Sequence, residues 1–142
     1  EYEVQGVKFF GWTSFHKPNK NILAKTVYGF ELEEIKVVVT GQLDTLPSAE
    51  LMEELKLSSR HGETHILVLP AKGSPLIDEL DAVKFVRRLE PNIVIPALCN
   101  TDTPKKFFSE LNQKPEPEEK LVIKRKDLAG QAMRVRWLTQ KN

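Results

Sequence analysis

Histidine and cysteine side chains are the first candidates for chemistry in this chain, because they can bind metal ions and transfer protons near neutral pH. The sequence has three histidines and one cysteine: His16, His61, His65 and Cys99. His61 and His65 are four residues apart, the spacing of a metal-binding pair on a helix, but Gly62 and the apolar run after His65 argue against a helix there. A lone cysteine after a buried strand usually packs as a small apolar residue. His16 lies in a polar loop, where a solvated histidine is the simpler interpretation.

Sequence motifs of the common enzyme mechanisms do not occur in this chain. It has no glycine-rich phosphate loop, no nucleophile elbow and no CxxC pair. The formal net charge of +1 gives no electrostatic reason for binding nucleic acid or an acidic membrane. The basic residues at 124–126 have acidic neighbours, so they predict a solvated face rather than a binding strip.

Composition indicates one folded domain over residues 1–142, with 40% hydrophobic and 29% charged residues. A single cysteine allows no internal disulfide, and the sequence has neither a signal peptide nor an apolar run near 18 residues. We therefore expect a cytoplasmic protein. Because the chain opens at Glu1 and not at methionine, we also expect that upstream sequence was removed or lies outside it.

A strand–helix–strand unit over residues 64–100 is the clearest structural pattern. Residues 66–69 and 93–95 are unbroken apolar runs, each followed by a proline, which is typical of buried strands in a parallel sheet. Between them, apolar residues recur at helical spacing from Leu76 to Leu89. Ser74 and Pro75 are predicted to cap the start of this helix, and Pro91 is predicted to end it.

Further strands and helices surround this unit. A hairpin is predicted at residues 2–10, followed by β structure within 22–32 and a strand at 35–39, and these strands are expected to be antiparallel. Helices are predicted after Pro47 and after Thr103, and closing strands are predicted at 121–123 and 133–137.

The predicted order of elements has a consequence for the architecture. Strands near residues 37, 66, 93 and 121 are separated by helices, and right-handed crossovers in one direction place those helices on one face of the sheet. The strands nevertheless look apolar on both faces. We therefore expect an α/β fold with a mixed sheet and helices on one face, whose second face is covered by another copy of the chain or by a partner segment. Pairing through the edge strand at 133–137 is the competing dimer geometry.

Four stretches of the sequence, in this order, resemble the C-terminal half of the metallo-β-lactamase superfamily. They are residues 1–7 (EYEVQGV), 41–43 (GQL), 65–70 (HILVLP) and 82–96 (AVKFVRRLEPNIVIP). The resemblance covers nearly the whole chain and is greatest to Zn-dependent hydrolases related to the ascorbate-6-phosphate lactonases. It implies that the chain is one αβ half of an αββα sandwich. In that family, both halves donate metal ligands at one edge of the sandwich.

Several metal ligands of that family have no counterpart in this chain. The His-x-His-x-Asp-His signature of the first half is absent, and Gln42 stands where a bridging aspartate is usual. Leu98 stands at the position of the last histidine ligand, and leucine cannot bind metal. The resemblance leaves His16, Asp44 and Cys99 as possible residual ligands, each of which has a simpler structural interpretation.

Two classes of function follow from this resemblance and its departures. The first is a non-catalytic metallo-β-lactamase-like domain that acts by assembly or binding and has no cofactor, as a homodimer or with a missing N-terminal half. The second is the C-terminal half of a metal-dependent hydrolase, of the lactonase or phosphodiester type, whose zinc ligands lie upstream. The loss of two ligands favours the first class. No catalytic residue is predicted, and the sequence does not indicate a substrate.

Overall fold

A computed structural model describes residues 2–4, 7–14, 25–40, 46, 49–57, 64–71, 77–97, 104–124, 126, 128 and 133–138. Seven of the described strands form one sheet, which contains, in spatial order, β1 (Tyr2–Val4), β2 (Val7–Ser14), β3 (Lys25–Leu32), β4 (Ile35–Val39), β5 (Ile66–Pro70), β6 (Ile93–Ala97) and β8 (Arg134–Val135). The described helices are α1 (Ala49–Leu57), α2 (Glu79–Leu89) and α3 (Lys105–Glu110). A separate small sheet pairs β7 (Pro117–Glu118) with β9 (Trp137–Leu138).

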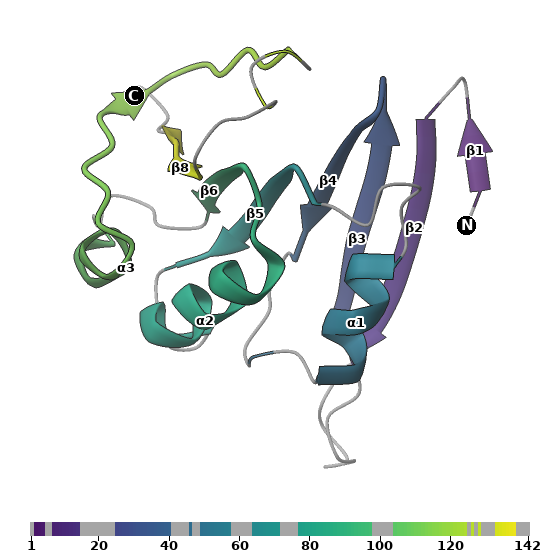
Figure 1. Cartoon of the computed structure of the whole chain (residues 1–142), viewed down its shortest axis with the longest axis horizontal. Helices are drawn as coiled ribbons and strands as arrows, with labels where there is room; N and C mark the ends of the chain where they lie inside the picture. Colours follow the sequence, from purple (N-terminus) through teal and green to yellow (C-terminus); the bar gives the residue numbers. More distant parts are fainter. Residues whose placement is uncertain are drawn as a thin grey trace.

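The large sheet is antiparallel from β1 to β4 and parallel from β4 to β8 (Figure 1). The parallel part follows from the order of elements, since helices lie between β4, β5 and β6, as parallel crossovers require. The predicted antiparallel strands, the predicted parallel unit and the α/β fold class are confirmed. The hairpin between β3 and β4 turns at Glu33 and Glu34, whose φ angles of 52° and 65° are those of a tight two-residue turn.

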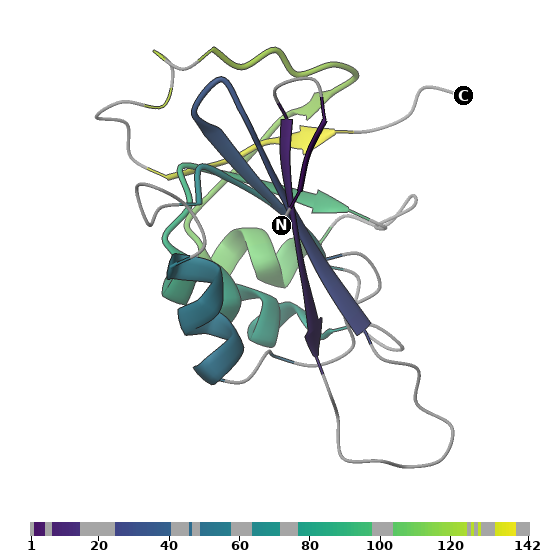
Figure 2. The ribbon, with the colours of Figure 1, turned by 90° about the vertical axis from the view of Figure 1, so that its right-hand side faces the viewer.

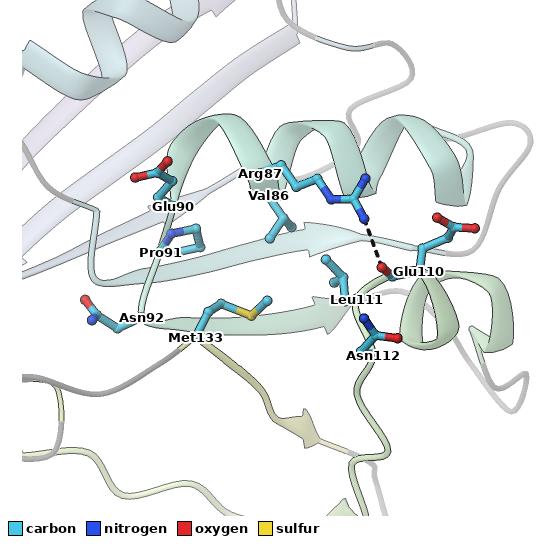
Figure 3. A pocket seen from close by; sticks show the side chains of 9 residues that line it. All are labelled: Val86, Arg87, Glu90, Pro91, Asn92, Glu110, Leu111, Asn112 and Met133. Carbon is cyan, nitrogen blue, oxygen red and sulfur yellow. Dashed lines mark hydrogen bonds between the residues drawn. The ribbon is translucent and has the colours of Figure 1, made fainter.

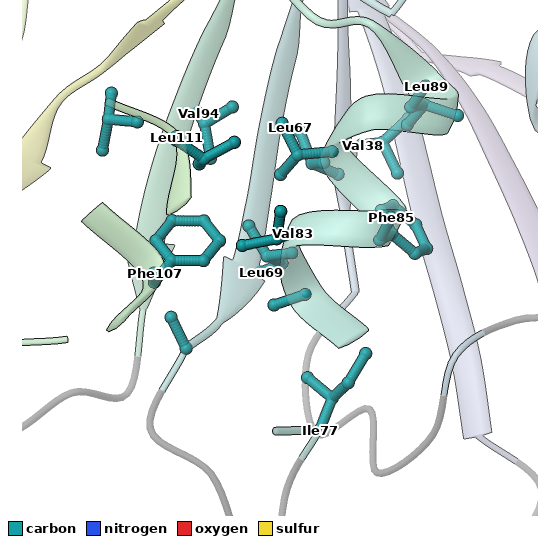
Figure 4. Packing of buried hydrophobic residues seen from close by; sticks show 14 of the residues in the cluster. Val38, Leu67, Leu69, Ile77, Val83, Phe85, Leu89, Val94, Phe107 and Leu111 are labelled. Carbon is teal, nitrogen blue, oxygen red and sulfur yellow. The ribbon is translucent and has the colours of Figure 1, made fainter. Parts of the chain in front are cut away.

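The helices α1, α2 and α3 all pack on one side of the sheet, which we call the helix face (Figures 1 and 2). Their apolar side chains join those of the strands in one continuous core (Figure 4). Phe85 of α2 and Phe107 of α3 are both fully buried in it. The predicted placement of the helices on one face is therefore correct.

The opposite side, which we call the second face, has its own smaller apolar cluster. Ile66, Ile93 and Leu128 are buried there, and partly buried apolar residues of β4, β5 and β6 pack against them. Side chains alternate along each strand, so Val38 points into the helix face and Val68 into the second face. Both faces of the central strands are apolar, as their unbroken sequence runs predict.

Two predicted details differ from the structure. Residues 121–123 are not a strand, and the strand that extends the parallel sheet beyond β6 is β8, whose pairs are Ile93 with Arg134 and Val94 with Val135. Leu121 and Ile123 instead pack against the cluster on the second face. The strand prediction failed because three consecutive apolar residues fit a covering segment as well as a strand.

The start of α2 is the second difference. The helix begins at Glu79, and its N-cap is Asp78, whose carboxylate accepts a hydrogen bond of 2.8 Å from the backbone N–H of Asp81. Ser74 and Pro75, the predicted cap, lie outside the described residues. Both Ser-Pro and Asp-Glu are good helix starts, and the apolar spacing fits either. The helix ends at Leu89 before Pro91, as predicted.

Candidate functional site

The carboxyl ends of β4, β5 and β6 meet at one edge of the sheet, where the resemblance places the metal site. The parallel register aligns Val39 with Val68, and Pro70 with Ala97. Thr40, buried on the helix face, extends this edge by donating from its backbone N–H to the Val68 carbonyl at 3.0 Å. Neighbouring strands lie about 4.8 Å apart, so the ends of β4 and β6 are roughly 10 Å from each other. The strand ends that precede positions 42 and 98 therefore lie at the same edge of the sheet, with the end of β5 between them.

All five residues named as degenerate or residual ligands lie outside the described residues: His16, Gln42, Asp44, Leu98 and Cys99. The chemistry of the donor set can still be compared with what zinc requires. An amide at position 42 is a neutral, poor ligand, and leucine at position 98 has no donor atom. These residues do not fit the metal that the family resemblance implies. Within the described ranges, no three His, Cys, Asp or Glu side chains are grouped so that they could hold an ion.

His65 has a structural role at the start of β5. Its Nδ1 accepts a hydrogen bond of 3.0 Å from the backbone N–H of Lys36. The backbone N–H of His65 in turn donates to the Lys36 carbonyl at 3.0 Å. Only 3% of His65 is exposed. Because Nδ1 accepts from an amide, this nitrogen is unprotonated and is not available as a metal ligand. His61, its partner in the four-residue spacing, lies outside the described residues.

Lys36 is a buried cation beneath α1 that the sequence analysis missed. Its side chain is 1% exposed, and its Nζ donates to the carbonyl of Leu55 in α1. Burial lowers the pKa of Lys36 from the ordinary 10.5 to about 8, while the nearby carboxylate of Glu31 acts in the opposite direction. The burial of Lys36 could have been predicted from the sequence. Side chains alternate along a strand, so residues 36 and 38 lie on the same face, and Val38 is expected to be buried.

The second face is an apolar surface that the described helices do not cover. Cross-strand pairing places Tyr28 opposite Val39, Phe30 opposite Val37, and Leu32 opposite Ile35. We call these six side chains the open ladder. Tyr28 is 59% exposed and Leu32 is 45% exposed, although apolar and aromatic residues of a central hairpin are usually covered.

Pockets among the described residues include one beside α2 and α3 and one beside the small sheet. The first, of about 460 Å³, lies between the end of α2, the end of α3 and Met133 (Figure 3). Its Arg87 donates from Nη2 to the carbonyl of Glu110 at 3.0 Å, so this cation already has a partner. The pocket borders the start of β6, which is the sheet edge opposite to positions 42 and 98.

The second pocket, of about 540 Å³, lies beside the small sheet. A bidentate ion pair borders this pocket. Arg136 donates from Nε and Nη2 to the two carboxylate oxygens of Glu118, at 2.7 and 2.5 Å. These hydrogen bonds hold the pKa of the Glu118 carboxyl below its usual value. The pair joins β7 to the segment between β8 and β9, so its evident role is structural.

No curated protein sequence matches the chain significantly. A solved structure from Thermotoga maritima, provisionally assigned as a Zn-dependent hydrolase of the metallo-β-lactamase superfamily, is similar, with a TM-score of 0.73 and 23% sequence identity. The match covers 97% of this chain and 69% of the other. At this identity the likeness establishes the fold alone.

A sequence family model covers most of the chain. The family described as the β-lactamase superfamily domain matches residues 1–97, from β1 through β6. Separately, none of the described helices is long and apolar enough to cross a membrane. Since the family match extends over more than half of the chain and agrees with the fold, the chain belongs to the β-lactamase superfamily domain family.

Proposed function

We propose that this chain is a non-catalytic member of the metallo-β-lactamase superfamily that acts by assembly or binding through the second face of its sheet. The observation that carries the proposal is the apolar character of this face from β3 to β6, together with the exposure of Tyr28 and Leu32. An exposed apolar surface of this kind on a folded protein commonly marks an interaction site. The donor set at positions 42 and 98 supports the absence of catalysis, because neither residue can replace an anionic or imidazole ligand.

The buried cluster on the second face supports a role in assembly, because it makes part of this face a well-packed surface. Ile66 and Ile93 are opposite each other on adjacent strands and are 8% and 6% exposed. Leu128 packs on them, and its carbonyl accepts a hydrogen bond of 3.2 Å from Asn92 Nδ2. This side of the face is thus ordered and filled, and it continues without a polar break into the open ladder through Val37 and Ile66. A rigid apolar surface needs little further ordering when a partner binds.

A metal-dependent hydrolase is the second candidate, with this chain as its C-terminal half and zinc ligands supplied from upstream. The fold likeness to the Thermotoga maritima protein favours it. Within the superfamily, the ascorbate-6-phosphate lactonase-like group is the one that the sequence resembles. In this alternative, the second face would be covered by the half that supplies the ligands.

We expect that restoring two family ligands, by Gln42→Asp together with Leu98→His, will not create hydrolase activity. Fewer than three good ligands hold zinc loosely, and a loosely held metal does not position a nucleophile against a substrate. The measurement is turnover of a generic phosphodiester and of a generic lactone, with zinc added.

The unaltered chain, assayed under the same conditions, is the control and should also be inactive. Turnover by the double variant that a chelator abolishes would contradict the proposal. Turnover by the unaltered chain would show that it is a hydrolase.

A further inference from the structure

The helix α3 has few features that would make it helical on its own. It contains six residues, whereas isolated helices shorter than about 12 residues are marginal in water. Its N-cap, Pro104, makes no side-chain hydrogen bond, and α3 has no acidic residue in its first turn and no basic residue in its last. Lys105 and Lys106 are instead cations at the positive end of its dipole. The helix must therefore be stabilised by its neighbours.

Two charged side chains of α2 supply the caps that α3 lacks. At the start of α3, the backbone N–H of Phe107 donates a hydrogen bond of 3.3 Å to Oε1 of Glu79. At its end, Nη2 of Arg87 donates to the carbonyl of Glu110 at 3.0 Å (Figure 3). We call Glu79 and Arg87 the charge clamp. Because the start of α2 contacts the start of α3, and the end contacts the end, the two helices run in the same direction.

The signs of the two charges suit both helices. Helices that run in the same direction bring the like ends of their dipoles together. Glu79 is a carboxylate in the first turn of α2, beside both positive ends, and Arg87 is a guanidinium in the last turn of α2, beside both negative ends. Each side chain therefore offsets the repulsion at its own end of the helix pair, and it does so across the gap between α2 and α3.

We propose that the charge clamp controls a local opening in which α3 leaves α2 as one unit and the pocket at the end of the two helices opens with it. Glu110, Leu111 and Asn112 form one side of this pocket of about 460 Å³, so movement of α3 removes that wall (Figure 3). The inference is separate from the proposed function, because it concerns the helix face and not the second face.

Apolar packing and the charge clamp hold α3 in different ways. Phe107 is fully buried, and the ring of Phe108 contacts the ring of Trp137 edge-on, with 5.6 Å between the ring centroids. Opening α3 must expose these rings, but it leaves the packing of α2 on the strands intact, so it needs less free energy than complete unfolding. Salt screens the charges of the clamp and does not screen the apolar contacts. The open population should therefore rise with ionic strength.

Amide hydrogen exchange of the full chain, followed residue by residue by NMR at constant pH, tests the proposal. The reporters are the backbone amides of Phe108 and Leu111, which both donate hydrogen bonds within the helix α3 and its cap. The amide of Ile93 at the start of β6, which donates to the His65 carbonyl at 2.9 Å, reports on the sheet. None of these residues is next to Glu79 or Arg87 in sequence, so substitutions there leave the intrinsic exchange rates of the reporters unchanged.

Glu79→Gln keeps an acceptor oxygen and removes the charge, whereas Arg87→Met removes both donor and charge. Each variant should raise the exchange rates of both α3 amides by the same factor, about two- to fivefold, which is the size of a charge–dipole interaction. The exchange rate of the Ile93 amide should not change. Asp81→Asn and Arg88→Met are the matched controls, because they remove the same charges from the same turns of α2, and they should leave α3 unchanged.

Ionic strength gives a second measurement. Raising the salt concentration from about 0.1 M to about 1 M should speed exchange in α3 of the unaltered chain, and it should have no such effect when both clamp residues are replaced. Three outcomes would overturn the inference. The first is a change confined to the amide at the substituted end, which would mean fraying and not movement as a unit. The second is equal acceleration by the control variants or at Ile93. The third is exchange in α3 that neither variant alters.

Discussion

Replacing Phe85 with alanine is expected to lower the free energy of unfolding by about 3–5 kcal/mol, the range for removing a buried phenyl ring. Phe85 is fully buried on the inner side of α2, in the cluster that also contains Val38 and Leu67 of the sheet. The loss combines the transfer of the ring with the cavity that the packed neighbours cannot fill. Urea unfolding followed by circular dichroism measures it.

The control for this prediction lies on the same helix. Leu80 is 51% exposed, and Leu80→Ala should change the free energy of unfolding by less than about 1 kcal/mol. Similar losses for both variants would mean that α2 does not pack on the sheet through the face that contains Phe85.

Replacing Lys36 with methionine is expected to remove a rise in stability between pH 8 and pH 10.5. The pKa of Lys36 is about 8 in the folded chain, against an ordinary value of 10.5. Between these values the unfolded chain binds the proton and the folded chain does not, so the free energy of unfolding increases with pH. The free energy of unfolding should rise by about 3 kcal/mol between the two pKa values. Below pH 8 the folded chain is less stable by this amount, because it must bury a charged ammonium group.

Denaturant unfolding of both proteins at pH 7 and pH 10.5 gives this difference directly. Other groups titrate in the same range, so the quantity to compare is the change with pH in the unaltered chain minus that in the variant. Lys84→Met is the control, because the Lys84 side chain is 62% exposed on α2 and should leave the rise in place. An unchanged rise in Lys36→Met would show that Lys36 is solvated in the folded protein.

Much of this fold could be predicted because its signals are local. The apolar runs before Pro70 and Pro96, which flank a helical pattern, are typical of strands covered on both faces, and β5 and β6 are such strands. The predictions failed for segments whose sequence patterns fit two structures. Residues 121–123 have the apolar character of a strand, yet the edge position beside β6 is taken by β8, which lies within the strand predicted at 133–137.

The candidate site was predicted less completely than the fold. The predicted helical crossovers imply that β4, β5 and β6 are parallel, and parallel strands have their carboxyl ends at the same sheet edge. The pairing of Lys36 with His65 could not be predicted, since it depends on the register between β4 and β5, which joins residues 29 positions apart. The exposure of Tyr28 and Leu32 likewise could not be predicted, since it depends on long-range packing over the second face.

The metal content of the purified chain tests the central claim most directly. The claim is that this member of the superfamily acts by assembly and has no catalytic metal, because Gln42 and Leu98 replace two of the family's ligands. Elemental analysis after expression in medium supplemented with zinc, manganese and iron should find no stoichiometric metal in the chain. About one or two metals per chain, retained through dialysis, would contradict the account and favour the hydrolase.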